Sequence, residues 1–276
     1  MPNFLFWNTH GKQIHDQVRT LAIERNAALI ILAECKLDIA RLVELLNRES
    51  SQQRESSQQY ETSLYELSPK KLVFIHNSVV KEFHLIRDSS FGSFGVFNTE
   101  KGKEVIIAAI HFPSKRDRDD FDFNVSAEEF RKELEKVERE RGHSRSVIVG
   151  DFNMNPFEDG MIAAKCLHTV MDCEIAKKRG RTVQGRFYKY LYNPMWGRMG
   201  DTSPGPPGTY FYNRSAQRNY FWHTFDQVLI RPDLIPNFPS EKLEVVQSIN
   251  ATSLLTKSGR PRKSISDHLP LVFAIE

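Results

Sequence analysis

Short apolar runs that end in polar, chemically active residues constrain the fold of this chain more than any other feature. Residues 147–149 (Val-Ile-Val) are typical of a short buried strand, and the sequence Gly-Asp-Phe-Asn follows directly. We expect Gly150 to let the backbone turn, so that Asp151 and Asn153 project from the end of the strand. A carboxylate and an amide in this arrangement can hold a water molecule and a phosphate oxygen together.

Five further segments of the same kind occur in a definite order along the chain, and each follows an apolar run typical of a strand. They are Trp7-Asn8, Ala33-Glu34-Cys35-Lys36, Ile110-His111-Phe112, Phe225-Asp226-Gln227 and Ser266-Asp267-His268. Taken singly, each could be a turn or a solvated carboxylate. Asp226 is harder to dismiss, because a charge inside an apolar strand needs a partner. All six together argue against chance.

The order of the predicted elements favours an α/β fold. Helical spacing of apolar residues covers residues 13–26, 39–46, 121–141 and 157–167. Strand-like runs cover residues 4–7, 28–33, 72–75, 83–86, 94–97, 105–110, 147–149, 225–230, 243–249 and 269–275. Because helices and strands intermix and hairpin-like pairs are common, we predict a four-layer α/β sandwich, with two mixed β-sheets packed face to face and helices outside. We expect residues 1–276 to form a single domain.

Two segments do not fit this pattern of helices and strands. Residues 47–59 are polar and contain the sequence Arg-Glu-Ser-Ser-Gln-Gln twice, which predicts a surface loop. Residues 177–224 are rich in turn-forming residues, including a Pro/Gly run at 203–208, and predict a long irregular loop. The many aromatic residues of this second segment argue against disorder and favour a functional loop.

Composition excludes several classes of protein. No apolar run approaches the roughly 20 residues that cross a bilayer, so we expect no membrane contact. The three cysteines, Cys35, Cys166 and Cys173, form no CxxC pair, which argues against a structural zinc site and a disulfide framework. The first strand follows Met1 so closely that no secretory signal fits before it. We therefore expect a cytoplasmic protein.

Six residues at the strand ends carry the groups that hydrolysis of a phosphate ester requires. The reaction needs a divalent cation, a base that activates water, and donors for the phosphoryl oxygens. Mg²⁺ prefers oxygen ligands, Mn²⁺ suits the same ligands, and a zinc protein would show more His and Cys. The candidates are Asn8, Glu34, Asp151, Asn153, Asp267 and His268.

The ordered motifs WN, AECK, IHF, GDFN, FDQ and SDH resemble those of the endonuclease/exonuclease/phosphatase superfamily, whose fold is DNase-like. The resemblance covers the chain from Asn8 to His268. It implies that Glu34 is the principal Mg²⁺ ligand, helped by Asn8 and Asp267. It also implies that Lys36 is a basic phosphate contact.

The resemblance further implies catalytic roles for the remaining residues. Asp151 would orient or deprotonate the attacking water, and Asn153 would contact the nucleophile or the scissile phosphate. His268 would contact a phosphoryl oxygen, with Asp226 fixing its tautomer and holding it charged. His111 would be a second phosphate-binding or leaving-group residue.

The sequence departs from the motifs of some relatives. The segment after residue 110 is His-Phe-Pro, where the exonuclease III-like enzymes that cleave abasic sites have a tyrosine motif, and this weakens a repair function. The WTDR segment of inositol polyphosphate 5-phosphatases is absent. Several relatives support the equivalent of His111 with an acidic residue, and we find no such partner in residues 60–90.

Basic residues interleaved with aromatic ones indicate the class of substrate. Residues 177–218 contain Lys177, Lys178, Arg179, Arg181, Arg186, Lys189, Arg198, Arg214 and Arg218, with Trp196 among the interleaved aromatics. A second basic cluster, Lys257, Arg260, Arg262 and Lys263, precedes Asp267. Basic charge attracts a phosphate backbone and aromatic faces stack on unpaired bases. The alternative is that the aromatics anchor the loop and the charges are solvated.

These observations together favour a divalent-metal-dependent phosphodiesterase. We expect a nuclease that hydrolyses DNA or RNA, preferably single-stranded or distorted, by in-line attack of an activated water. One alternative is a phosphatase or phosphodiesterase of the same superfamily that acts on a small-molecule or lipid phosphoester. The other is a non-catalytic nucleic-acid-binding module, which would be expected to have lost Glu34, Asp151 or His268, and all three are present.

Overall fold

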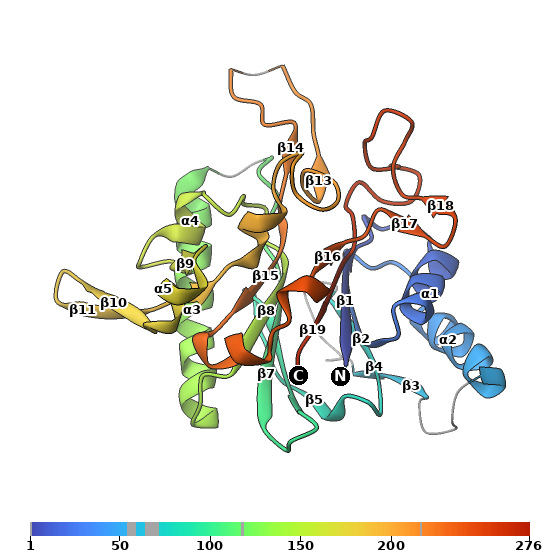
Figure 1. Cartoon of the computed structure of the whole chain (residues 1–276), viewed down its shortest axis with the longest axis horizontal. Coiled ribbons are helices and arrows are strands. Elements are labelled where there is room, and N and C mark those ends of the chain that lie inside the picture. Colours follow the sequence, from blue (N-terminus) through green and yellow to red (C-terminus); the bar gives the residue numbers. More distant parts are fainter. Residues whose placement is uncertain (1, 54–58, 64–71, 117–118, 216) are drawn as a thin grey trace.

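Two mixed β-sheets pack face to face between helices in the computed structural model, which describes residues 2–53, 59–63, 72–116, 119–215 and 217–276 (Figure 1). In these residues one sheet has six strands, in the order β16 (Glu244–Val245), β19 (Leu271–Ala274), β1 (Asn3–Asn8), β2 (Ala27–Ala33), β4 (Val73–Asn77) and β3 (Tyr60–Ser63). The second sheet has seven described strands, in the order β5 (Lys81–Asp88), β6 (Ser93–Asn98), β7 (Glu104–His111), β8 (Ser146–Asp151), β15 (Asp226–Ile230), β12 (Leu191–Tyr192) and β9 (Thr169–Val170). The predicted α/β sandwich is confirmed.

The main core lies between the sheets. Phe4 of β1 stacks on Phe273 of β19 and contacts Phe97 of β6, with ring centroids 5.2 and 5.4 Å apart. Every residue of β2 is buried, because α1 (His15–Glu24) and α2 (Ile39–Gln53) cover the other face of the six-stranded sheet (Figure 1). A strand buried on both faces is a continuous apolar run, as the sequence of β2 is.

Helix α3 (Asp120–Arg141) covers the outer face of the seven-stranded sheet (Figure 1). Successive residues of β7 alternate between the two sides: Ile107 joins the core between the sheets, and Ile106 packs on the side of α3. The helix begins at a capping box in which Asp119 and Asp122 satisfy each other's backbone N–H groups. It ends at Gly142, whose φ of 72° is the left-handed conformation that glycine adopts readily.

Strand pairing brings the polar strand ends to one edge of the sandwich. Strands β1 and β2 are parallel, and Asn8 pairs with Ala33, the residue before Glu34. Strands β7 and β8 are also parallel, and β15 runs antiparallel to β8. In this register Asp151 lies between His111 and Asp226 on the neighbouring strands.

Three predicted elements differ from the structure. Helix α2 continues to Gln53, so residues 47–53 of the predicted polar loop are helical. The sequence there contains no Gly or Pro to end the helix, and residues 54–58 lie outside the described residues. The predicted helix at 157–167 is reduced to α4 (Asp159–Ile162). The predicted strand at 243–249 is divided into β16 and β17 (Ser248–Ile249), which pairs with β18 (Thr252–Ser253).

The segment 177–224 contains several short regular elements and is not one continuous irregular loop. After α5 (Cys173–Lys177) it forms the hairpin β10 (Gly180–Val183) and β11 (Arg186–Lys189), and then strand β12 of the large sheet. Beyond the 3-10 helix η1 (Pro194–Arg198), β13 (Tyr210–Phe211) pairs with β14 (Trp222–His223). The β10–β11 hairpin projects sideways from the molecule, whereas the β13–β14 hairpin rises from the edge where β1 ends (Figure 1).

The remaining 3-10 helices, η2 (Pro232–Asn237) and η3 (Ser240–Lys242), follow β15. Among the residues that the structure describes, no helix combines the length and apolar character needed to cross a bilayer.

Candidate active site

Both sheets contribute side chains to one cluster at the edge where their polar strand ends meet. The six-stranded sheet supplies Asn8, at the end of β1, and Glu34, directly after β2. The seven-stranded sheet supplies the ends of β7 and β8 and the start of β15. The segment before β19 is tied to β1, because Ser266 Oγ donates to the carbonyl of Asn8 over 2.8 Å.

Asp151 lies at the centre of this cluster and is almost fully buried. Its Oδ2 accepts a hydrogen bond of 3.0 Å from Asn8 Nδ2, and its Oδ1 accepts one of 2.9 Å from the backbone N–H of Asn153. The Nε2 atoms of His268 and His111 lie 3.8 and 3.9 Å from Asp151 Oδ2. The carboxylate is therefore fixed in position by neutral donors and faces two imidazoles.

His268 and Asp226 form a buried pair behind Asp151. Nδ1 of His268 lies 2.8 Å from Asp226 Oδ2. Burial opposes protonation of the imidazole, but the charges of Asp226 and Asp151 outweigh it and raise the pKa of His268 to about 10. Burial raises the pKa of Asp226, and the charge of His268 opposes that rise. A protonated His268 donates through Nδ1 to Asp226, which leaves the Nε2 proton directed toward the site.

Glu34 and His111 form the second acid–imidazole pair, with His111 Nε2 3.3 Å from Glu34 Oε1. This hydrogen bond is the largest of the effects that lower the pKa of Glu34 to about 2. Burial works against protonation of His111, but the hydrogen bond to Glu34 and the charge of Asp151 raise its pKa. The acidic neighbours of His111 are thus Glu34 and Asp151, outside the residues 60–90 where the sequence suggested none.

Oxygen atoms suited to a hard cation gather on the open side of the cluster. Glu34 is ionised, and Asn8 Nδ2 donates to its Oε1 over 3.2 Å. Asp267 Oδ1 is buried and accepts no hydrogen bond within the described residues, although His10 Nδ1 lies 3.4 Å away. The same His10 nitrogen lies 3.7 Å from Glu34 Oε2. A charged and an unsatisfied carboxylate on either side of one imidazole form a donor set that fits a divalent cation.

A second group also has the spacing of a metal site. Asp151, Asp226 and His268 offer ligand atoms within 4.8 Å of one another. Nδ1 of His268 already faces Asp226 over 2.8 Å, and the raised pKa of His268 favours a protonated imidazole, which offers no lone pair to a metal ion. We therefore take Glu34 and Asp267 as the candidate cation site.

The cluster opens into a cavity of about 1110 Å³. Five of the eight predicted catalytic and metal-binding residues line it: Glu34, Asp151, Asn153, Asp267 and His268. The other three, Asn8, His111 and Asp226, do not line the cavity but contact residues that do. The cavity wall also contains residues that sequence reasoning did not assign to the site: His10, Lys115, Arg116, Phe157 and His223. Tyr210, one of the aromatic residues interleaved with the basic ones in the sequence, also lines it.

Two of these additional residues have a marked chemical character. Burial and the neighbouring Lys115 lower the pKa of His223 to about 4, so this imidazole is neutral. Its Nδ1 lies 3.1 Å from Asn155 Nδ2. The Lys115 ammonium lies 5.7 Å from the ring centroid of Phe225 and pairs with Glu158. The Lys-Arg pair that follows the IHF motif was the available sequence signal, whereas His223 lies in a segment without a motif.

Most of the basic residues predicted to bind substrate lie elsewhere. Arg214 and Arg218 line the cavity, and both belong to the segment that connects β13 to β14. The other predicted residues do not line it: Arg179, Arg181, Arg186, Lys189, Trp196 and Arg198. Part of the basic segment therefore lies away from this cavity, because β10 and β11 form a hairpin of their own.

Local contacts explain where these residues are held. Arg179 pairs with Asp233 over 2.5 Å, and Lys189 with the buried Glu138 over 3.1 Å. Arg181 Nε lies 3.1 Å from His168 Nε2, the Arg186 guanidinium lies 5.1 Å from the ring centroid of Tyr188, and Arg198 donates to the carbonyl of Ser240. Trp196 contacts Phe157, whose ring lines the cavity, at 6.3 Å between ring centroids. Lys36 is exposed and lies along Gly11 rather than in the cavity.

The backbone is unusual at the strand ends. Glu34 and Asn153 have φ angles of 48° and 50°, in the left-handed region that residues with a side chain seldom adopt. Gly150 lies inside β8 and is not the turn residue that we expected. A Cβ atom on Gly150 would lie 2.1 Å from the carbonyl oxygen of Ile110, so only glycine lets β8 approach β7 this closely.

Comparison with solved structures places the fold among known ones. No family model matches the sequence, and no curated protein sequence matches it. The Neisseria 3′ phosphatase NExo, solved with a product DNA hairpin, is 17% identical with a TM-score of 0.55, and the match covers 100% of both chains.

Two other structures match over nearly the whole chain. The human Nocturnin catalytic domain with a bound sulfate is 16% identical with a TM-score of 0.54, over 100% of this chain and 94% of that one. An endonuclease/exonuclease/phosphatase family protein from Bacteroides thetaiotaomicron is 10% identical with a TM-score of 0.53, over 99% and 93%. The resemblance that the motifs indicated is confirmed for the fold: this chain has the four-layer fold of the endonuclease/exonuclease/phosphatase family.

Proposed function

We propose that this chain is a divalent-metal-dependent phosphodiesterase that hydrolyses nucleic acid. The observation that carries the proposal is the arrangement around Asp151. This buried carboxylate faces the cavity beside a protonated His268 and a pair of carboxylates, Glu34 and Asp267, suited to a cation. An anionic base, a fixed proton donor and a cation site within one cavity are the parts that phosphoester hydrolysis requires.

The residues of the chain divide the reaction among them. Asp151 takes a proton from the attacking water, and the side-chain oxygen of Asn153 helps to orient that water. Asn153 is itself fixed, because its Nδ2 donates to the carbonyl of Phe112 over 2.9 Å. The Nε2–H group of His268 donates a hydrogen bond to a non-bridging oxygen, where negative charge grows as the new P–O bond forms. The ester P–O bond breaks, the leaving oxygen takes a proton from bulk water, and Asp151 later releases the proton that it took from the attacking water. Asp226 keeps His268 in the tautomer and charge that this role needs.

Glu34 and Asp267 would hold the cation, with Asn8 orienting Glu34 through its amide. A bound Mg²⁺ or Mn²⁺ supplies neutralisation of phosphoryl charge. His111 is held by Glu34 on the same side of the site and would contribute positive charge near the leaving oxygen. The similarity to a phosphatase solved with a DNA hairpin supports this chemistry.

The lining of the cavity favours a nucleic-acid substrate over a small phosphoester. Arg116, Arg214 and Arg218 supply positive charge, which binds a phosphate backbone, whereas Lys115 is paired with Glu158. The acidic residues Asp120 and Asp159 line the same cavity. Phe157, Tyr212 and Tyr220 supply aromatic faces on which bases can stack, each stacked base contributing about 1–3 kcal/mol. A cavity of about 1110 Å³ has room for more than a single phosphate group.

The test is a cleavage panel with purified protein and Mg²⁺ or Mn²⁺, offering single- and double-stranded DNA, RNA, an abasic duplex, inositol phosphates and bis(p-nitrophenyl) phosphate. We expect cleavage of a nucleic acid, and Asp151→Asn to lower kcat by about 10²- to 10⁴-fold because the general base is lost. Asp201→Asn is the matched control, since Asp201 is exposed and does not line the cavity.

Two other outcomes would contradict the proposal in different ways. Activity confined to small phosphoesters, and lost in Asp151→Asn, would keep the chemistry and replace the substrate. Binding of nucleic acid without hydrolysis of any compound in the panel would instead favour a non-catalytic binding module.

A further inference from the structure

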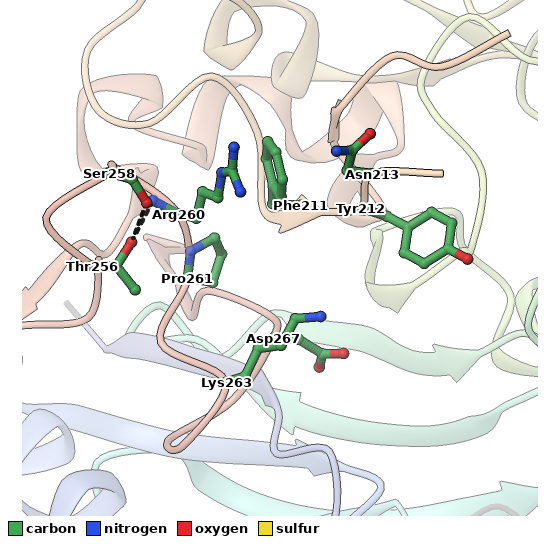
Figure 2. A pocket seen from close by; sticks show the side chains of 9 residues that line it. All are labelled: Phe211, Tyr212, Asn213, Thr256, Ser258, Arg260, Pro261, Lys263 and Asp267. Atoms are coloured by element: carbon green, nitrogen blue, oxygen red, sulfur yellow. Dashed lines mark hydrogen bonds between the residues drawn. The ribbon is translucent and has the colours of Figure 1, made fainter. Parts of the chain in front are cut away.

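A second cavity of about 400 Å³ adjoins the active-site cavity. Three residues, Tyr212, Lys263 and Asp267, line both cavities, so the two lie next to each other at the candidate cation site. Figure 2 shows the second cavity between the β13–β14 hairpin and the loop that precedes His268. A ligand held at Asp267 therefore has two directions in which to extend.

Planar groups form one wall of the second cavity. The Arg260 guanidinium lies 4.6 Å from the ring centroid of Phe211, and both side chains line the cavity (Figure 2). Tyr212 is stacked on Tyr210, with ring centroids 6.4 Å apart and an interplanar angle of 16°. A guanidinium stacked on an aromatic ring is a surface on which a nucleobase stacks well, because it is planar and weakly hydrated.

Polar side chains of the second cavity could bind the phosphate and the base edge of a nucleotide. The Lys263 side chain points toward the same side as Asp267, where a phosphate bound at the cation site would lie (Figure 2). The Asn213 amide lines the cavity near Phe211 and can hydrogen-bond the edge of a base. The volume of about 400 Å³ falls within the range of small-molecule sites and suits a single nucleotide.

The β13–β14 hairpin separates the two cavities. Phe211 and Asn213 line the second cavity, whereas Tyr210, Arg214 and Tyr220 line the first. Two neighbouring bases of one strand that enter different cavities must unstack from each other and lose their pairing partners. The hairpin would thus hold apart the two bases that flank the scissile phosphate.

We propose that the second cavity is a nucleotide subsite that takes the unpaired base next to the scissile phosphate, on the side of Asp267, and stacks it against Arg260 and Phe211. This inference rests on the proposed nuclease function and specifies its substrate as a strand whose bases are unpaired at the cleavage site.

The experiment compares Arg260→Ala and Phe211→Leu with the wild type on two substrates. One is a single-stranded oligonucleotide with mapped cleavage positions, and the other is bis(p-nitrophenyl) phosphate, which has no base. Ser264→Ala is the control, because Ser264 lies on the same loop, is exposed and lines neither cavity. Thermal unfolding verifies that each variant is folded.

We expect each subsite variant to lower the ratio of kcat/KM for the oligonucleotide to that for bis(p-nitrophenyl) phosphate by about tenfold, the loss typical of one stacked base. Replacing the nucleotide that flanks the cleaved phosphate with an abasic residue should slow the wild type similarly and abolish the difference between wild type and variants. Ser264→Ala should leave the ratio unchanged.

The outcomes separate this inference from the function on which it rests. If the wild type cleaves the oligonucleotide and the variants retain the wild-type ratio, the subsite is wrong and the nuclease function stands. A variant defect that persists on the abasic strand also contradicts a base-binding subsite. If the wild type cleaves no polynucleotide, the proposed function fails and the subsite fails with it.

Discussion

His268 depends on carboxylates that approach it from two sides. Asp226 holds Nδ1, and Asp151 lies 3.8 Å from Nε2. In a fully buried position a neutral imidazole would be expected, because removing a charge from water is costly. The two acidic neighbours reverse that preference. The imidazole therefore stays protonated over the pH range in which the proposed phosphoester cleavage would need a hydrogen-bond donor.

Asp226→Asn should shift the pH dependence of the enzyme. The Asp226 anion raises the pKa of His268 to about 10, so its removal lowers that pKa. Because the protonated imidazole is the active form, we expect the alkaline limb of the pH–rate profile to move to lower pH. Titration of the imidazole by NMR should show the same displacement. An unchanged alkaline limb would mean that another group limits the rate at high pH.

The same pair links stability to pH. The pKa of His268 is raised from 6.5 in the unfolded chain to about 10 in the folded protein. Its stabilisation is therefore complete below pH 6.5 and is lost as the pH rises through 10. In Asp226→Asn this loss should occur at lower pH, which urea unfolding at several pH values would detect.

Glu34→Gln should weaken cation binding with little change of shape. The substitution removes the negative charge and keeps the size of the side chain, so a ligand is lost without a cavity. We expect weaker Mn²⁺ binding in calorimetry and a kcat lowered by about 100-fold or more, because a metal ion contributes several kcal/mol. Glu44→Gln, on the exposed side of α2, is the control. Full Mn²⁺ affinity in Glu34→Gln would locate the cation elsewhere.

At the scale of elements, the close approach of β7 and β8 aligns His111 with Asp151. Gly150 makes that approach possible, because a Cβ atom there would overlap the backbone of Ile110, which cannot move without shifting the strand.

Gly150→Ala should consequently destabilise the fold and disturb the site together. We expect an unfolding free energy lower by at least about 1–3 kcal/mol, the usual cost of overpacking a core. The matched control is Gly197→Ala in η1, where an added Cβ meets no atom within 4 Å. Urea unfolding of both variants provides the measurement, and equal stabilities would show that β7 and β8 can separate at little cost.

The sequence predicted the elements that carry the site better than those that surround it. Buried strands such as β2 and β8 are continuous apolar runs, and their polar ends are visible as motifs. The helix predicted from the sequence ends at residue 46, whereas α2 continues to Gln53. The prediction ends too early because the last residues of α2 are polar, although the sequence contains no Gly or Pro there that would end a helix. The sequence predicts the residues of the β10–β11 hairpin to be part of a substrate-binding loop. Composition cannot show at which end of a sheet a segment lies. The position of such a segment depends on pairing between strands that are distant in the sequence, and this pairing is set by the whole fold.

The site also shows what sequence motifs do not predict, namely which residues from different strands contact each other. Each motif residue could be assigned a chemical role, but the pairing of His111 with Glu34 joins strands of different sheets. Lys115 follows the IHF motif and Tyr210 belongs to the basic aromatic segment, but the sequence did not indicate that they and His223 meet in one cavity.

At the scale of the whole molecule, the active site exists only while the two sheets remain packed together. Glu34 and Asn8 come from one sheet, and His111 and Asp151 from the other. The core between the sheets holds these halves in register, with Phe4 in contact with aromatic rings from both. Weaker packing at this interface should therefore affect catalysis and stability at the same time.

Phe4→Ala tests this dependence. Removing a fully buried ring leaves a cavity between the sheets, and we expect an unfolding free energy lower by about 3–5 kcal/mol. Phe187→Ala is the control, because Phe187 is 57% exposed and its loss should change stability by no more than about 0.5 kcal/mol. Activity and intrinsic fluorescence followed in the same urea titration should be lost together in both variants, at a lower urea concentration for Phe4→Ala. If activity in Phe4→Ala disappears well before the fluorescence transition, the two sheets separate before either unfolds, and the strand ends that form the site are less tightly coupled than the shared core indicates.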